Sequence, residues 1–198
     1  MIEKAIMLKK ILFPLFAALL LAGCAGQSNT LEVTPKIALP QPDPSVMGAT
    51  VSINGADQRP DQALARVNRD GQLVTLTPSR DLRYLLQEVL EKQMTARGYM
   101  VGPNGTVDLQ IIVNKLYADV SEGNLRYNIT TSTDISIIAT AKNGNKQTKH
   151  YQSVYSVQGA FNATNDIITK AVNNVLGGVI GDMAQDASIG QFIRENSH

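Results

Sequence analysis

The residue with the clearest chemistry in this sequence is Cys24, the only cysteine among 198 residues. It directly follows the small residues Ala22 and Gly23, at the end of an uncharged apolar run that begins at Ile11. A cysteine thiolate is the strongest nucleophile among protein side chains, which suits it to alkylation. The small residues before it allow the backbone to enter a protease site. This spacing predicts a modified cysteine beside a cleavage point.

Residues 1–23 have the features of a secretion signal peptide. Lysine side chains give the first ten residues a positive charge, and the apolar run 11–22 follows them. That run is shorter than the roughly 20 residues that a permanent membrane span requires. We therefore expect the segment to be removed after export. Translation begins at Met1 or Met7, and the sequence leaves both possibilities open.

The segment Leu21-Ala22-Gly23-Cys24 resembles the lipobox of bacterial lipoproteins. The resemblance implies a thioether-linked diacylglyceryl group on Cys24, cleavage between Gly23 and Cys24, and an N-acyl group on the new amine. Ala25 follows the cysteine, where an aspartate is associated with retention in the inner membrane. The resemblance thus also implies transfer by the lipoprotein sorting machinery to the periplasmic face of the outer membrane. The alternative is an ordinary secreted protein with a free cysteine.

Charge and cysteine content restrict what the rest of the chain does. The sequence carries 18 basic and 17 acidic residues, and this near-neutral balance argues against nucleic acid as a partner. With its only cysteine lipidated, the mature protein forms no disulfide and depends on a hydrophobic core. About 150 residues are enough to build one. We expect a single periplasmic domain over residues 46–198.

Residues 24–45 are expected to form a tether between the lipid and this domain. Four prolines favour an extended chain without helix. At roughly 3 Å per residue, such a tether lifts the domain off the membrane by a few tens of ångströms at most. A second possibility is that part of the segment lies on the domain as an edge strand, because these apolar residues alternate: Leu31, Val33, Ile37 and Leu39.

The first half of the domain is predicted to contain a strand, a hairpin and a helix. A strand over residues 46–53 is expected to end at the turn Asn54-Gly55, and Asp70-Gly71 predicts the tip of a hairpin. A helix follows, with Thr77 as its cap and Pro78 at its first position. Its apolar residues have helical spacing: Leu82, Leu85, Leu86, Val89, Leu90 and Met94.

The second half is predicted to contain a meander of three strands and a C-terminal helix. Alternation over residues 107–113 changes phase near Lys115, which indicates a β-bulge. Asn143-Gly144 predicts a tight hairpin, and an apolar stripe from Ile167 to Met183 predicts the last long helix. The expected fold class is α+β: a two-layer sandwich with a mainly antiparallel sheet and two helices packed on one face.

The sequence offers little catalytic chemistry. Its two histidines, His150 and His198, are too few for a metal-binding cluster or for a base paired with a nucleophile. No P-loop, dinucleotide-binding turn or nucleophile elbow is present. Acidic residues on the predicted first helix lie close to basic ones, which indicates a solvated face instead of a glycosidase pair. We expect a non-enzymatic protein without metal or other cofactor, apart from the lipid on Cys24.

Tyrosines mark the candidate binding surface. Tyr117, Tyr127, Tyr151 and Tyr155 fall on three successive predicted strands. Cross-strand aromatic pairs more often stabilise a sheet than bind a ligand. If the helices cover a single face of the sheet, however, the other face is free. A tyrosine-bearing open face would suit a protein partner or a glycan.

Three further segments give the chain a family resemblance. They are residues 51–59, 85–94 and 97–105, with the sequences VSINGADQR, LLQEVLEKQM and RGYMVGPNG. Together with the lipobox, they resemble the YajG family of enterobacterial lipoproteins over essentially the full length. This resemblance implies an outer-membrane lipoprotein and transfers no activity.

The leading hypothesis is therefore an accessory module that binds a protein partner in the cell envelope. The alternative is a carrier or transport accessory for a lipid or a glycan such as a peptidoglycan fragment. Such a carrier requires a concave apolar pocket between the helices and the sheet.

Overall fold

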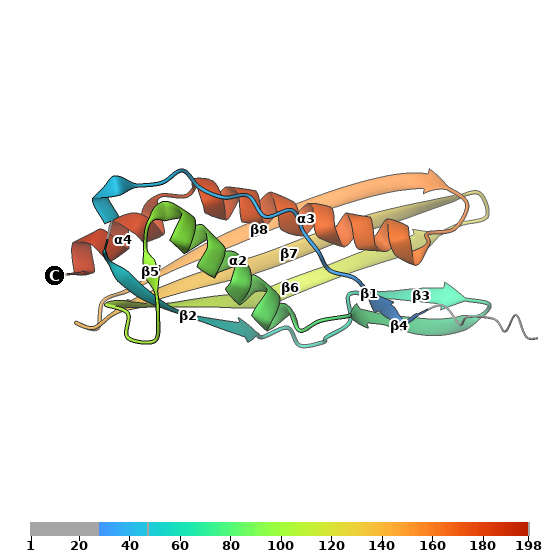
Figure 1. Ribbon diagram of the computed structural model, residues 1–198. Helices are drawn as coiled ribbons and strands as arrows, with labels where there is room; N and C mark the ends of the chain where they lie inside the picture. Colours follow the sequence, from blue (N-terminus) through green and yellow to red (C-terminus); the bar gives the residue numbers. More distant parts are fainter. Residues whose placement is uncertain (1–27, 47, 198) are drawn as a thin grey trace, which may run out of the picture.

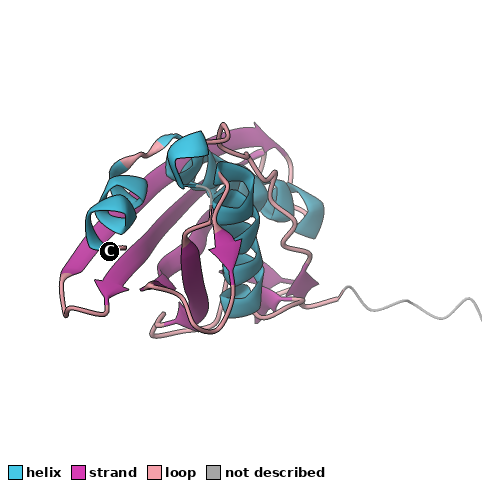
Figure 2. Cartoon of the chain, turned by 60° about the vertical axis from the view of Figure 1, so that its left-hand side comes forward, coloured by secondary structure: helices cyan, strands magenta, loops and turns pink. Residues whose placement is uncertain are grey.

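In the computed structural model, residues 28–46 and 48–197 are described, and in them a sheet of eight strands lies against a layer of three helices (Figure 1). A view turned by 60° shows the helices gathered on one side of the sheet (Figure 2). This arrangement confirms the two-layer α+β fold expected from the sequence. It contains one helix more than the two that were expected.

Three long antiparallel strands form the main part of the sheet, as the predicted meander requires. They are β6 (Val107–Glu122), β7 (Arg126–Ala141) and β8 (Lys146–Ala160). The register of β6 against β7 shifts between Val113 and Lys115, which confirms the predicted bulge. Gly144 has the positive φ that a tight turn between β7 and β8 requires.

The other edge of β6 is shared by two groups of shorter strands. β2 (Thr50–Asp57) runs parallel to the first half of β6, and β5 (Met100–Val101) lies outside it. β3 (Ala65–Arg69) meets the second half of β6, followed outward by β4 (Gln72–Pro78) and β1 (Thr30–Leu31). The pairings of β2 and β3 with β6, of β5 with β2 and of β1 with β4 are parallel, whereas β3 and β4 are antiparallel. The sheet is therefore mixed, although its longest pairings are antiparallel.

The helices cover the sheet through apolar stripes with helical spacing. Helix α2 (Leu82–Arg97) packs on β2 and β6. Helix α3 (Asn165–Gln185) packs mainly on β7 and β8, and the shorter α4 (Ser188–Asn196) packs on the same two strands near the C-terminus. One continuous core joins the two layers. Its fully buried side chains include Leu86, Leu90, Leu109, Ile111, Ile135 and Ile137.

The start of α2 differs from the prediction. Asp81, and not Thr77, is the N-cap, and its carboxylate accepts a hydrogen bond from the N–H of Arg83 at 2.8 Å. Pro78 ends β4 and pairs with Leu31 of the short strand β1. A proline lacks the N–H that a central strand must donate, so it is tolerated here near the margin of the sheet. The helix therefore begins only after this strand has ended.

The predicted turn at Asn54-Gly55 is also wrong, because β2 continues through both residues to Asp57. Gly55 lies beneath the first turn of α2. A Cβ atom at this position would lie 2.2 Å from the backbone oxygen of Arg83, far closer than real Cβ contacts. Glycine is needed here for the close approach of a helix to a strand, and not for a reversal of the chain.

Much of the expected tether is part of the domain. We call residues 29–46 the N-terminal strap, which contains β1 and the short 3-10 helix η1 (Pro44–Val46). Leu31 is fully buried, and the N–H of Thr34 donates to Asn173 Oδ1 of α3 at 2.8 Å. The domain thus begins near residue 29 and not at residue 46. The possibility of an edge strand in this segment is confirmed by β1.

Candidate functional site

The face of the sheet opposite the helices is a polar surface formed by β6, β7 and β8. Side chains alternate along each strand, so the apolar residues under the helices alternate with polar residues on the other face. We call this second surface the open face. Its β7 members show its character: Asn128, Thr130, Ser132, Asp134 and Ser136.

Asp134 is the centre of a hydrogen-bonded cluster on the open face. Asn114, at the bulge in β6, donates to Asp134 Oδ1 at 3.1 Å, and Gln152 of β8 donates to Oδ2 at 2.7 Å. Burial alone would raise the pKa of Asp134, but these hydrogen bonds outweigh it and hold the pKa below its ordinary value. The carboxylate is therefore ionised at neutral pH and engaged by two amides.

Ser136 and His150 extend this cluster without forming a catalytic triad. Ser136 Oγ lies 3.1 Å from His150 Nδ1, and Asp134 Oδ1 lies 3.5 Å from the same nitrogen. A Ser–His–Asp hydrolase needs the hydroxyl and the carboxylate on different ring nitrogens, so that one nitrogen takes the proton while the other orients the ring. Here both groups approach one nitrogen. The arrangement is a polar hydrogen-bonded network and does not suit acyl transfer.

The outer edge of β8 is free in the part of the chain that the structure describes, where this strand pairs only with β7. It is 15 residues long. Edge strands expose unpaired N–H and C=O groups, and charged residues or prolines commonly protect them. The first half of β8 contains Lys146, Lys149 and His150, whereas residues 152–160 contain no charged residue and no proline. The second half is thus open to pairing with another strand.

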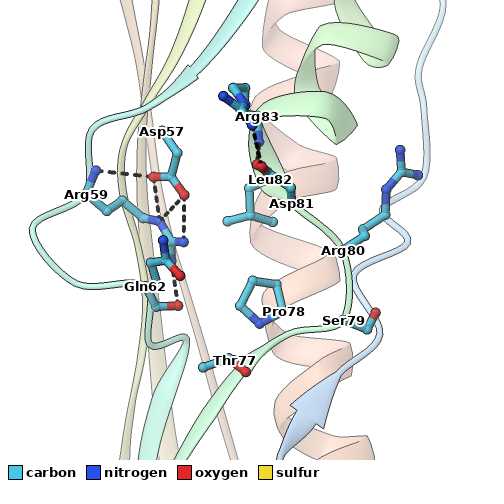
Figure 3. Close-up of a pocket in the computed structure, with 10 residues that line it drawn as sticks. All are labelled: Asp57, Arg59, Gln62, Thr77, Pro78, Ser79, Arg80, Asp81, Leu82 and Arg83. Carbon is cyan, nitrogen blue, oxygen red and sulfur yellow. Dashed lines mark hydrogen bonds and ion pairs between the residues drawn. The ribbon is translucent and has the colours of Figure 1, made fainter.

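A cavity of about 480 Å³ lies beside the start of α2 (Figure 3). Arg59 forms a fork with Asp57, with Nε at 2.9 Å from Oδ1 and Nη2 at 2.8 Å from Oδ2, and its side chain is only 3% exposed. The other two arginines in the wall are also paired with carboxylates: Arg83 with Asp81, and Arg80 with Glu88. Since these positive charges are balanced within the protein, the geometry does not favour an anion site.

The expected tyrosine-bearing open face is not formed. Tyr127 and Tyr151 are buried under the helices, and Tyr155 is half-buried on the same side of the sheet. Tyr117 lies on the open face, opposite Ser132, because it follows the bulge with the parity of the polar residues. The four side chains therefore do not share a surface, and three of them contribute to packing.

Tyr151 has a structural role at the junction of α3 and α4. Its hydroxyl donates to Asp186 Oδ2 at 3.2 Å, and burial raises the pKa of Tyr151. Lys149 Nζ lies 3.3 Å from the same oxygen, and the N–H of Ser188 donates to Asp186 Oδ1 at 2.7 Å. Burial alone would raise the pKa of Asp186, but the bonds from Ser188 and Lys149 prevail and lower it.

We predict that Asp186→Asn lowers the free energy of unfolding at neutral pH by about 2 kcal/mol, as is typical of hydrogen bonds to a charged group. The folded-state pKa lies below the ordinary value of 3.8. The stabilisation is therefore present above that value and is lost as the pH falls through the folded pKa. Urea unfolding should show the difference between wild type and variant shrinking below about pH 4.

The matched control for this prediction is Asp119→Asn, since Asp119 is an exposed carboxylate on β6. Its substitution should change the free energy of unfolding by less than about 0.5 kcal/mol. A difference between wild type and Asp186→Asn that stays constant down to the lowest pH at which the protein folds would contradict the assigned ionisation.

The predicted lipidation and sorting residues lie outside the described residues: Leu21, Ala22, Gly23, Cys24 and Ala25. The roles assigned to them remain predictions. Within residues 28–46 and 48–197, no helix is both long and apolar enough to cross a membrane. Over those same residues, histidine and acidic side chains do not gather into a group that could hold a metal ion.

The chain is similar to a family model, to curated relatives and to a solved structure. Residues 35–194 match the model of the Lipoprotein_16 family, described as "Uncharacterized lipoprotein". The chain is 69% identical to "Uncharacterized lipoprotein YajG" of Escherichia coli K12 over 191 residues. These residues cover 96% of this chain and 100% of the relative. The protein of the same name from Escherichia coli O6:H1 gives the same values. A solved structure of a Xanthomonas campestris protein of the DUF330 family is similar with a TM-score of 0.54 and 13% identity, over 84% of this chain and 99% of that one. At this identity, the likeness concerns the fold alone.

Proposed function

This chain belongs to the Lipoprotein_16 family of lipoproteins. We propose that it is a non-enzymatic outer-membrane lipoprotein whose periplasmic domain binds an extended segment of an envelope protein along β8. Cys24 carries the lipid in this proposal, and Ala25 permits sorting to the outer membrane. The observation that supports protein binding is the free, uncharged second half of the β8 edge.

Strand addition explains how this edge would recognise a partner. An extended peptide that pairs with an edge strand gains affinity from main-chain hydrogen bonds and specificity from the side chains that alternate beside it. Along β8, Tyr155 and Val157 are half-buried on the helix side, while Val154 is 68% exposed on the open face. A partner strand would find apolar contacts on both sides. The Asp134 cluster would supply polar contacts next to them.

The alternative of a lipid or glycan carrier has weaker support. A carrier requires a concave apolar site between the helices and the sheet. In the residues that the structure describes, the side chains between these layers pack into one buried core, among them Leu90, Ile137 and Val179. The observations therefore favour a partner that binds at the edge and the open face.

The proposal is tested in cells with a photo-crosslinking amino acid in place of Ser156, which is exposed on β8. We expect one dominant protein adduct. Adding Val154→Lys should reduce that adduct about tenfold or more, equivalent to about 1.4 kcal/mol of binding, because a lysine protects an edge against strand addition. The protein should stay folded, since Val154 is exposed.

The matched control places the same lysine at Tyr84 of α2, which is 58% exposed and lies on the helix layer. Tyr84→Lys should leave the adduct at position 156 unchanged. Equal losses in the two lysine variants, or no protein adduct at position 156, would refute binding along β8.

A further inference from the structure

The N-terminus of the described chain leaves the domain at a fixed place. The backbone oxygen of Ser28 accepts a hydrogen bond from Asn165 Nδ2, at the first residue of α3, at 2.8 Å. The next residues are held by β4, since Thr30 pairs with Thr77. In Figure 1 this exit lies toward the right-hand end of the molecule, near the β3–β4 hairpin and the start of α3.

The chain between this exit and the predicted lipid is short. Only four residue steps separate Cys24 from Ser28, and an extended chain spans at most about 3.5 Å per residue, or roughly 14 Å in total. The hairpin tip extends about five residues of β4 beyond Thr77, which is roughly 17 Å along a strand. Counted from the same level, the six residue steps from Cys24 to Thr30 span at most roughly 21 Å, only slightly more than the hairpin. A lipid on Cys24 therefore reaches little further than the loops at this end, so these loops lie close to the bilayer surface when the domain stands on this end.

This end of the domain exposes three large apolar side chains, which we call the apolar end. They are Leu73 beside the β3–β4 hairpin, Leu125 in the β6–β7 turn and Phe161 after β8, and they are 72%, 75% and 73% exposed. Isolated surface apolar residues are common, but apolar residues that cluster at one place mark contact with a protein or a membrane.

The loops of the apolar end are tied together. The N–H of Phe161 donates to the backbone oxygen of Leu125 at 3.1 Å. Arg69 joins the hairpin to the same region, with Nη2 donating to the Ala163 oxygen at 2.6 Å and Nη1 at 3.3 Å from Glu122. The three apolar side chains thus belong to one supported unit and not to independent loops.

The backbone at Phe161 adopts a φ of 65°, in the left-handed region that bulky residues rarely enter. The fold therefore holds an aromatic ring outward at a position where its backbone is unfavourable. Aromatic rings are well suited to the boundary between lipid headgroups and acyl chains, where an apolar body meets a polar environment. Nearby exposed charges of both signs, Arg126 and Asp70, give this end no strong net charge.

We propose that Leu73, Leu125 and Phe161 insert into the surface of the same bilayer that holds the lipid on Cys24. The domain then stands on this end with its long strands directed away from the membrane. This inference rests on the proposed lipidation of Cys24. At about 3.3 Å per residue, 16-residue strands place the opposite end of the sheet roughly 50 Å from the bilayer.

The absence of tryptophan from the sequence provides a direct test. Full-length lipidated protein carrying Phe161→Trp is incorporated into vesicles of phosphatidylethanolamine and phosphatidylglycerol with brominated acyl chains. The single tryptophan is expected to lose most of its fluorescence relative to unbrominated vesicles. Met100→Trp is the matched control because Met100 is 60% exposed on β5, which Figure 1 shows at the opposite end. Its fluorescence is expected to be unchanged.

The outcomes separate this inference from the proposal on which it rests. If the protein floats with the vesicles but the Phe161→Trp variant is no more quenched than the Met100→Trp variant, the lipid anchor stands and the insertion of the apolar end is refuted. If mass spectrometry finds no acyl group on Cys24 and the protein does not float, both proposals fail. A second tryptophan variant, Leu125→Trp, should be quenched like Phe161→Trp. If both are quenched in vesicles that contain no other protein, this end needs no protein partner to reach the bilayer.

Discussion

Replacing Gly55 with alanine is expected to destabilise the domain by about 3 kcal/mol, at the upper end of the usual cost of overpacking. The added methyl group would lie 2.2 Å from the backbone oxygen of Arg83 and 3.0 Å from its carbonyl carbon. Backbone atoms in the first turn of a helix do not rotate away as a side chain does, so α2 must move off β2. Because a domain is stabilised by only about 5–15 kcal/mol, this loss is large. Urea unfolding of the chain without residues 1–24 measures it.

Gly181→Ala is the matched control for this substitution. Gly181 lies inside α3, and a Cβ atom there would meet nothing within 4 Å outside its own helical turn. The same methyl group should therefore stabilise the protein, by up to about 1 kcal/mol, through helix propensity. If both variants change stability equally, the close packing of α2 on β2 is not the reason for glycine at position 55.

Replacing Cys24 with alanine is expected to move nearly all of the protein from the membrane fraction to the soluble periplasmic fraction. Each buried CH₂ of an acyl chain contributes about 0.8 kcal/mol, so two or three chains anchor a protein stably, whereas a protein without them depends on weak surface contact. The three side chains of the apolar end are too few to replace that anchor. Membrane sedimentation and mass spectrometry of the N-terminal peptide provide the measurement.

Ala25→Asp provides the control for the anchor. The lipid on Cys24 should remain, while the sorting rule that the lipobox resemblance implies predicts retention in the inner membrane. Separation of the two membranes on a density gradient distinguishes this outcome from release. A Cys24→Ala protein that stays in the membrane fraction would show that another part of the chain anchors it.

Local patterns in the sequence predict the long elements of this fold well. The meander β6–β7–β8 follows from alternation of polar and apolar residues, and the change of phase at Lys115 locates the bulge between β6 and β7. The turns at Asp70-Gly71 and Asn143-Gly144 each join two antiparallel strands, as their residue types require. In these places, the signal that defines the structure is contained within a few adjacent residues.

The errors occur where a distant segment determines the role of a residue. Asn54-Gly55 has the composition of a turn, but the helix that packs over Gly55 begins almost thirty residues later. Pro78 has the composition of a helix start, but β1 from the N-terminal strap pairs with it and keeps it in a strand. Neither partner is visible from the neighbouring sequence. The strap itself has the composition of a tether, because its prolines indicate only an extended chain.

The candidate binding surface was predictable in part. Tyr127 has the same parity along its strand as Ile129, so alternation alone indicated that it points into the core. The partner of His150 was not predictable from the turn alone. A two-residue turn at Asn143-Gly144 would place His150 opposite Ile137, whereas the loop closed by Ala141 and Asn145 places it opposite Ser136 on the other face. The free edge of β8 could not be predicted, because it depends on which strands pair and not on the residues of β8.

The N-terminal strap also constrains when the protein can fold. Thr34 is bonded to a residue 139 positions later, and Gln93 donates both to the Ala38 oxygen of the strap and to the Ile180 oxygen of α3, at 2.9 Å each. Contacts between segments so far apart in sequence form slowly and only when both are available. If the chain is exported with its N-terminus first, as the proposed signal peptide requires, these strap contacts form only after α3 has crossed the membrane.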